Sequence, residues 1–105
     1  MNEDRAIETL LALGQRTRLA VYRLLIEYGD SGLSVSEIAT SLSVNISTLS
    51  RHLRQLERAG LLVNRRRDRQ IFYAIDFDGM DQLMGFLNEN CCRSLPDECP
   101  DTRLS

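Results

Sequence analysis

The sequence predicts a mainly α-helical domain with one small β-hairpin, and two observations support this prediction. The first is composition, because 105 residues, 43% of them hydrophobic and 27% charged, suit one globular domain with a modest core. The second is patterning: apolar residues recur at helical spacing along most of the chain, whereas branched and aromatic residues dominate the stretch after Gly60. We expect one folded domain over residues 1–92 and an irregular tail over residues 93–105.

Two amphipathic helices are expected at the start of the chain. The first spans residues 4–13 and is interrupted at Gly14. The second spans residues 17–28 and carries apolar side chains on most of its circumference, which is typical of a helix buried in the core. The glycines and polar residues of the segment 29–32 then predict a turn.

A pair of helices joined by a short turn follows. Ser34 and Glu37 have the spacing of a capping box at the start of a helix over residues 35–42. Only Ser43 and Val44 separate this helix from the next one. Two helices joined so closely are typical of a helix-turn-helix, in which the second helix enters the major groove of DNA.

The second helix of this pair spans residues 45–59 and has two distinct faces. Asn45 can cap its first turn, and Gly60 can adopt the left-handed conformation that ends it. Polar side chains cover most of its surface, so that face is available to a partner. An apolar stripe is expected to face the core and consists of Ile46, Leu49, Leu53 and Leu56.

A hairpin and a last helix complete the predicted domain. Residues 61–63 and 70–75 are strand-like, and the arginine-rich run 65–69 between them predicts a hairpin with a basic tip. The last helix spans residues 78–90, and its many apolar groups predict that part of it packs against a second copy of the chain. These apolar positions are Met80, Leu83, Met84, Phe86 and Leu87.

Charge is segregated along the chain, although the net charge is only −2. Residues 51–69 hold seven arginines against Glu57 and Asp68, a local charge of +5, whereas residues 76–105 carry −5. Arginines, together with small hydroxyl side chains at the start of the second helix of the pair, suit contact with DNA phosphates and bases. The candidate DNA-binding residues are Ser47, Thr48, Ser50, Arg51, His52, Arg54, Arg65, Arg66, Arg67 and Arg69.

Other classes of protein are disfavoured. No apolar run approaches the length of a membrane span, and the start Met-Asn-Glu-Asp-Arg lacks the pattern of an export signal, so we expect a cytoplasmic protein with no membrane partner. Paired catalytic carboxylates, a phosphate-binding glycine loop and a Cys-His nucleophile pair are not evident, so we do not expect an enzyme. A protein-interaction domain without a DNA role is an open alternative.

Three cysteines, Cys91, Cys92 and Cys99, lie near the C-terminus. A structural disulfide is not expected in a reducing cytoplasm. The residues themselves leave three interpretations open: a metal or metalloid site, a redox switch, or side chains that only pack.

Four segments carry a resemblance to a known family. They are Leu13-Gly-Gln-Arg-Thr-Arg-Leu19, Ser47-Thr-Leu-Ser-Arg-His-Leu53, Leu56-Glu-Arg-Ala-Gly-Leu-Leu62 and residues 65–73. In order and spacing they resemble the arsenical-resistance repressor (ArsR-type) family of winged-helix metal sensors. The resemblance implies a winged helix-turn-helix with its recognition helix at residues 45–59 and its wing at 61–75. It also implies a homodimer that pairs through its first and last helices and binds double-stranded operator DNA.

The resemblance further implies where a ligand binds. Some members use a Cys-x-Cys pair at positions that here are Ser34-Val35-Ser36, and others use Asp and His on the last helix, whereas the only histidine here is His52. The pair Cys91 and Cys92 with Cys99 resembles instead the arsenite-responsive subgroup. This implies a repressor that leaves DNA when arsenite or antimonite binds the three thiolates, with no organic cofactor.

Ligand chemistry agrees with that subgroup. Three thiolates complete the shell of trivalent arsenic or antimony, whereas zinc prefers four ligands. A thiol-based redox or persulfide-sensing repressor on the same scaffold is an alternative, since one cysteine of the pair can oxidise and react with the third. A zinc or cadmium sensor is another, because a fourth ligand is available from Asp97, Glu98 or Asp101.

Overall fold

The structure is a computed structural model that describes residues 1–94. Within this part the chain is mainly helical, with a small antiparallel sheet, as the sequence predicts. The elements in chain order are α1 (Glu3–Leu13), α2 (Arg16–Ile26), the 3₁₀ helix η1 (Gly29–Ser31), β1 (Leu33–Ser34), α3 (Val35–Leu42), α4 (Ile46–Arg58), β2 (Leu62–Arg67), β3 (Gln70–Ile75) and α5 (Phe77–Asn88).

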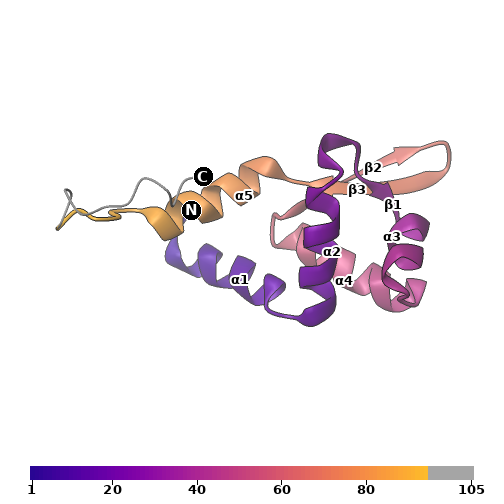
Figure 1. The fold of residues 1–105 in the computed structure, drawn as a ribbon, viewed down its shortest axis with the longest axis horizontal. Coiled ribbons are helices and arrows are strands. Elements are labelled where there is room, and N and C mark those ends of the chain that lie inside the picture. Colours follow the sequence, from indigo (N-terminus) through magenta and orange to yellow (C-terminus); the bar gives the residue numbers. More distant parts are fainter. Residues whose placement is uncertain (95–105) are drawn as a thin grey trace.

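Two groups of elements form the two ends of the molecule (Figure 1). Helices α1 and α5 pack against each other at one end, and the sheet with the projecting β2–β3 hairpin lies at the other. Helices α2 and α4 lie in the middle of the molecule, and α3 lies below the sheet at the same end as the hairpin. None of the helices in residues 1–94 combines the length and the apolar character needed to cross a membrane.

The sheet contains one strand more than the predicted hairpin. Its order is β1-β3-β2, and β1 pairs with β3 through Leu33 opposite Tyr73. A strand of two residues, Leu33–Ser34, is too short to show an alternating pattern, which is why the sequence did not indicate it.

The position of the wing arginines differs from the predicted loop. Arg65, Arg66 and Arg67 belong to β2, and the turn consists only of Asp68 and Arg69. Both turn residues have positive φ, 49° and 69°, as in the two-residue turns whose twist matches the strands of a hairpin. The ladder therefore continues to the pair Arg67 and Gln70.

The core confirms most of the predicted apolar stripe of α4. Leu49, Leu53 and Leu56 are completely buried, but Ile46 is 52% exposed because it lies in the first turn, at the end of the helix. Helix α2 also differs from expectation, since it buries one face and leaves Leu19 exposed. Other fully buried core residues are Val21, Leu25, Ile38 and Leu61.

Both ends of α4 have the predicted caps. The Asn45 side-chain oxygen accepts from the backbone N–H groups of Ser47 and Thr48. At the other end Gly60 has φ of 82°, and the N–H of Leu61 donates to the Leu56 carbonyl at 3.0 Å. This is the Schellman arrangement, and it fixes the direction of the chain that leaves α4.

The start of helix α5 contacts the turn that follows α4. The Asp76 N–H donates to the Leu61 carbonyl at 2.9 Å, and the Asp76 side chain caps α5 through the N–H of Gly79. Gly79 lies so close to Gly60 that a methyl group at Gly79 would overlap the Gly60 carbonyl oxygen. The end of α4 and the start of α5 are therefore in backbone contact.

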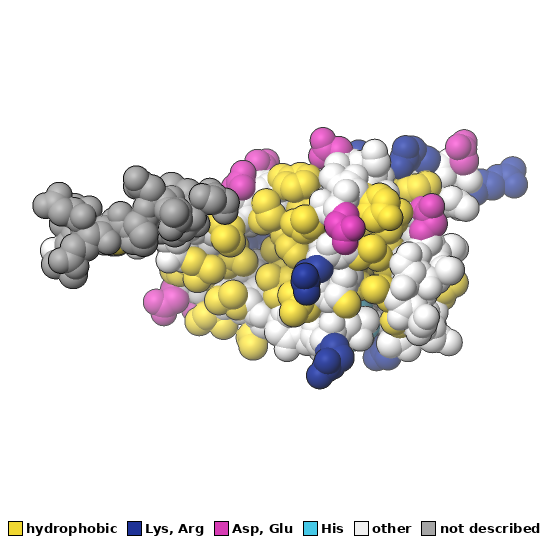
Figure 2. Space-filling model, in the orientation of Figure 1, with side chains coloured by type: hydrophobic (Ala, Val, Ile, Leu, Met, Phe, Trp, Pro, Cys, Tyr) yellow, Lys and Arg dark blue, Asp and Glu magenta, His cyan; other side chains and the backbone are white. Residues whose placement is uncertain are grey.

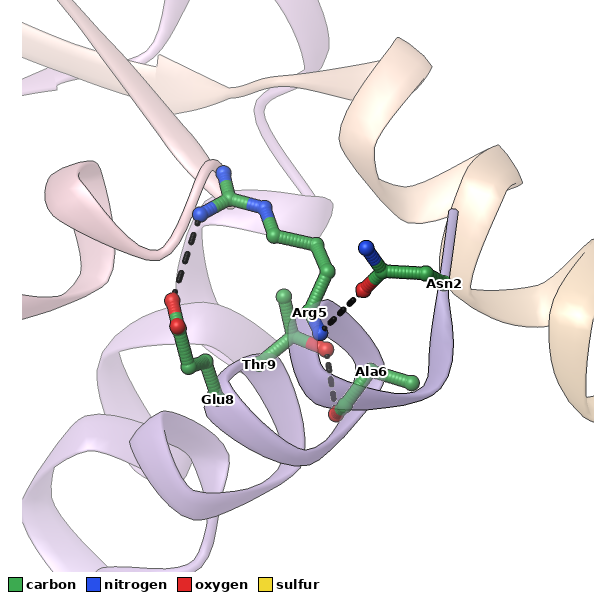
Figure 3. A network of polar contacts seen from close by, with 5 residues as sticks. All are labelled: Asn2, Arg5, Ala6, Glu8 and Thr9. Carbon is green, nitrogen blue, oxygen red and sulfur yellow. Dashed lines mark hydrogen bonds and ion pairs between the residues drawn. The ribbon is translucent and has the colours of Figure 1, made fainter.

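Helix α1 has its own cap and local polar network (Figure 3). The Asn2 side chain accepts from the Arg5 N–H at 2.8 Å, and the guanidinium of Arg5 pairs with Glu8 at 3.4 Å. The hydroxyl of the buried Thr9 donates to the Ala6 carbonyl at 2.8 Å. These bonds all lie within α1 and its cap, so they stabilise the start of the helix that packs against α5.

Candidate nucleic-acid interface

One row of exposed side chains runs along α4 opposite its buried leucines. Ser47, Arg51, Arg54 and Arg58 follow one another at steps of three or four residues, so they lie on one face of the helix. We call these four residues the α4 row. Arg58 is absent from the sequence-based candidates, although its spacing from Arg54 is the signal that would have included it.

The acid of α4 lies on the side of the helix that faces the sheet, away from the centre of the α4 row. Glu57 accepts hydrogen bonds from the side chains of Asn64 and Tyr73 on the sheet. Burial and the nearby Glu57 carboxylate raise the pKa of Tyr73, so its hydroxyl stays protonated as a donor. Ser50 and Arg54 line the same groove between α4 and the sheet, whose volume is about 290 Å³.

His52 lies apart from the α4 row. Its Nδ1 is 3.1 Å from a guanidinium nitrogen of Arg18 on α2. Burial lowers the pKa of His52 below its usual value of 6.5, and the charges of Arg18 and Arg51 lower it further. The ring is therefore neutral at pH 7. Of the other predicted residues in this helix, Thr48 is half-buried in the first turn.

The structure divides the wing arginines into two pairs. Arg65 donates to the backbone carbonyl of Asp30 at 3.1 Å, and Arg67 donates to that of Ser31 at 3.2 Å. The Arg67 guanidinium also lies 4.2 Å from the ring centroid of Phe72. Strand alternation places Arg66 on the opposite face of the sheet, and Arg69 occupies the exposed turn.

The cysteine pair lies just beyond α5. The Cys91 N–H donates to the Asn88 carbonyl in the last turn of the helix, and the sulfur atoms of Cys91 and Cys92 are 3.5 Å apart. Cys99 lies outside the described residues, as do the possible oxygen ligands Asp97, Glu98 and Asp101. Within residues 1–94, three metal-ligating side chains do not gather at any point.

Helices α1 and α5 together present an exposed apolar face. Figure 2 shows hydrophobic side chains gathered at this end of the molecule. The last-helix residues divide between core and surface: Leu83 is buried, Met80 and Phe86 are half-buried, and Met84 is 51% exposed. Further exposed apolar side chains on the two helices are Ile7, Leu10, Leu11 and Leu87.

Comparison with known proteins places the region around α4 in a recognised family. The helix-turn-helix domain family matches residues 13–65. The transcriptional activator HlyU of Vibrio cholerae is 29% identical over 93 residues, which cover 89% of this chain and 83% of HlyU. Its solved structure superposes with a TM-score of 0.68 over 88% of this chain and 99% of the HlyU chain.

Two other relatives extend the comparison. The arsenical resistance operon repressor of Escherichia coli is 33% identical over 69 residues, which cover 66% of this chain and 57% of the repressor. A solution structure from Mycobacterium bovis is described as a homodimeric winged helix-turn-helix DNA-binding domain of a possible ArsR-family regulator. It is 25% identical, with a TM-score of 0.68, and the match covers 90% of this chain and 85% of that one.

Proposed function

The chain belongs to the helix-turn-helix family of transcriptional regulators, and from this premise we propose that it is a metalloid-responsive repressor. It is a DNA-binding regulator and not an enzyme. In the proposed cycle the empty dimer holds operator DNA, and arsenite or antimonite bound by Cys91, Cys92 and Cys99 releases it. The observation that carries this proposal is the cysteine pair at the end of α5, the helix whose start contacts the end of α4.

The α4 row supports binding in the major groove. A helix of 13 residues is about 20 Å long, which is enough to cross the groove. Arginine can donate two hydrogen bonds to guanine or a phosphate, and the hydroxyl of Ser47 can approach base edges closely. In a two-fold dimer the two α4 helices read half-sites about 34 Å apart.

The apolar face of α1 and α5 supports pairing with a second copy. Leu11 is 69% exposed and Leu87 is 52% exposed, although both are large apolar side chains. Contiguous exposed apolar surface of this kind marks an interface in a protein that stays in solution. The Mycobacterium bovis relative is homodimeric, which agrees with this assignment.

The two sulfur atoms lie close enough together to share one soft ligand. With metal–sulfur bonds of about 2.3 Å and bond angles of roughly 90–110°, two sulfurs on one centre lie about 3.3–3.8 Å apart. The 3.5 Å between the sulfurs of Cys91 and Cys92 falls within this range. A third thiolate, from Cys99, then completes the three-coordinate shell that trivalent arsenic or antimony prefers.

In the wing, we expect Arg66 and Arg69 to supply most of the phosphate contacts. Arg66→Ala and Arg69→Ala should each reduce the slope of log Kd against log salt concentration by about two, because each substitution removes one phosphate contact from each subunit of the dimer. Arg65→Ala and Arg67→Ala are the matched controls, and they should change the slope less because these guanidinium groups donate to η1. Fluorescence polarisation over a salt series measures all four slopes, and equal changes would contradict this division.

A titration of the DNA complex tests the proposed function. The probe is a labelled duplex from the region upstream of the chain's own gene, titrated in parallel with arsenite, antimonite, zinc, cadmium and hydrogen peroxide. Arsenite or antimonite should raise Kd by about tenfold or more, which is within the usual range of allosteric coupling. Release by peroxide alone would indicate a redox sensor, and release by zinc or cadmium alone a divalent-metal sensor. A wild-type chain that does not prefer this duplex to unrelated DNA would contradict the repressor assignment.

A further inference from the structure

Arg18 connects three helices through one side chain. Its Nε donates to the carbonyl of Ala12 in the last turn of α1 at 2.6 Å. One terminal nitrogen lies 3.1 Å from Nδ1 of His52 and 2.5 Å from the side-chain oxygen of Gln55, both on α4. Its own backbone N–H is held by Gln15, the N-cap of α2. We call these contacts the Arg18 clamp.

The two groups on α4 that accept from Arg18, on His52 and Gln55, fix the rotation of that helix about its own axis. His52 and Gln55 are three residues apart, so they lie on the same side of α4, between the α4 row and the buried leucines. A helix held only by buried leucines can rotate slightly in its groove. Hydrogen bonds at two levels on one side, made to a guanidinium that is itself bonded to Ala12, restrict this rotation.

From these contacts we propose that Arg18 is a positioning residue for DNA recognition, which sets the direction of the α4 row relative to α1. The proposal rests on the DNA-binding part of the proposed function and not on the identity of the inducer. Arg18 lines a groove between α1 and α4 together with Glu8 and Arg58, and it is half-buried. It therefore acts through α4 instead of contacting DNA itself.

The clamp requires a neutral His52. Nδ1 can accept from Arg18 only while it carries no proton, so the proton of the neutral ring belongs on Nε2. The charged groups around the ring are Arg18 from α2 and Arg51 from its own helix, and Glu8 of α1 lies across the groove from Arg18. Protonation below the lowered pKa of His52 replaces the hydrogen bond by repulsion from Arg18. The clamp is complete at pH 7 and above and is lost as the pH falls.

Three variants test this inference in the full chain. Arg18→Gln removes the clamp, and Arg16→Gln is a control that loses the same charge from the exposed first turn of α2. Arg18→Gln should weaken binding to the upstream duplex about tenfold, weaken binding to unrelated DNA less than about twofold, and leave the salt slope unchanged. His52→Gln keeps an oxygen acceptor that does not titrate, so it is the reference against which the pH dependence of the wild type is measured. Wild-type affinity relative to His52→Gln should then fall as the pH drops from 7.5 through the lowered pKa of His52.

The possible outcomes are distinct. Equal losses on both duplexes with a shallower salt slope would make Arg18 a phosphate contact and overturn the inference, as would unchanged affinity. A rise in wild-type affinity relative to His52→Gln on acidification would also overturn it, because the added charge would then outweigh the lost bond. Circular dichroism checks folding, and His52→Phe, which lacks the acceptor, should reproduce the selective loss if Arg18→Gln does not fold. A wild-type chain that binds the duplex but ignores arsenite would contradict the proposed inducer and leave this inference intact.

Discussion

Arsenite is expected to lose its effect on the DNA complex when Cys91, Cys92 or Cys99 is replaced by serine, while DNA affinity without arsenite stays within about twofold of wild type. A serine hydroxyl stays protonated at neutral pH and is a hard ligand, so it cannot replace a thiolate on a soft metalloid. Two remaining thiolates leave the three-coordinate shell incomplete, and the arsenite concentration needed for release should rise at least about 100-fold. Fluorescence polarisation with the upstream duplex measures both quantities.

The control for this series is Ser94→Ala, which changes an exposed residue in the same segment without removing a thiol. It should respond to arsenite as wild type does. A triple cysteine variant that still leaves DNA on addition of arsenite would show that the sensor site lies elsewhere. Single variants that no longer bind DNA would instead give the cysteines a structural role.

The second large effect is expected from the α4 row. Replacing Arg51 and Arg54 together by alanine should weaken binding to the upstream duplex about 100-fold or more, because each well-placed arginine contact contributes roughly 1–3 kcal/mol. Polarisation at constant salt measures the loss, and light scattering shows whether the variant keeps the dimeric mass of wild type. Arg16→Ala with Arg23→Ala is the matched control, since it removes the same charge from exposed positions on α2. Similar losses in the two double variants would mean that only net charge matters and that α4 is not the recognition helix.

Local sequence signals predicted the helices well, because caps act over a few residues. The capping box of Ser34 and Glu37 gives α3 its predicted bounds, and Asn45 and Gly60 mark the two ends of α4. The prediction that Ile46 faces the core was wrong, because helical spacing alone does not show where along its length a helix leaves the core.

Contacts between distant segments could not be predicted in the same way. The bond from Arg65 to Asp30 and the bond between Arg18 and His52 join residues more than 30 positions apart, and both depend on how the helices and the sheet pack. The candidate DNA-binding residues were therefore chosen by residue type and spacing. These do not show which side chains bond within the protein, as those of Arg65 and His52 do, and which stay exposed, as those of Arg66 and Arg51 do. The role of Cys99, outside the described residues, stays a prediction.

The contact between Gly60 and Gly79 has a mechanical consequence. Side chains between two packed helices can change rotamer and so absorb a small movement of either helix. Here backbone meets backbone, so a tilt at the start of α5 is passed directly to the end of α4. Over the roughly 20 Å of α4, a tilt of about 10° moves the far end by about 3.4 Å, the spacing between successive base pairs. A small reorientation of α5 would thus move the start of α4, where Ser47 lies, by about the spacing of one base pair.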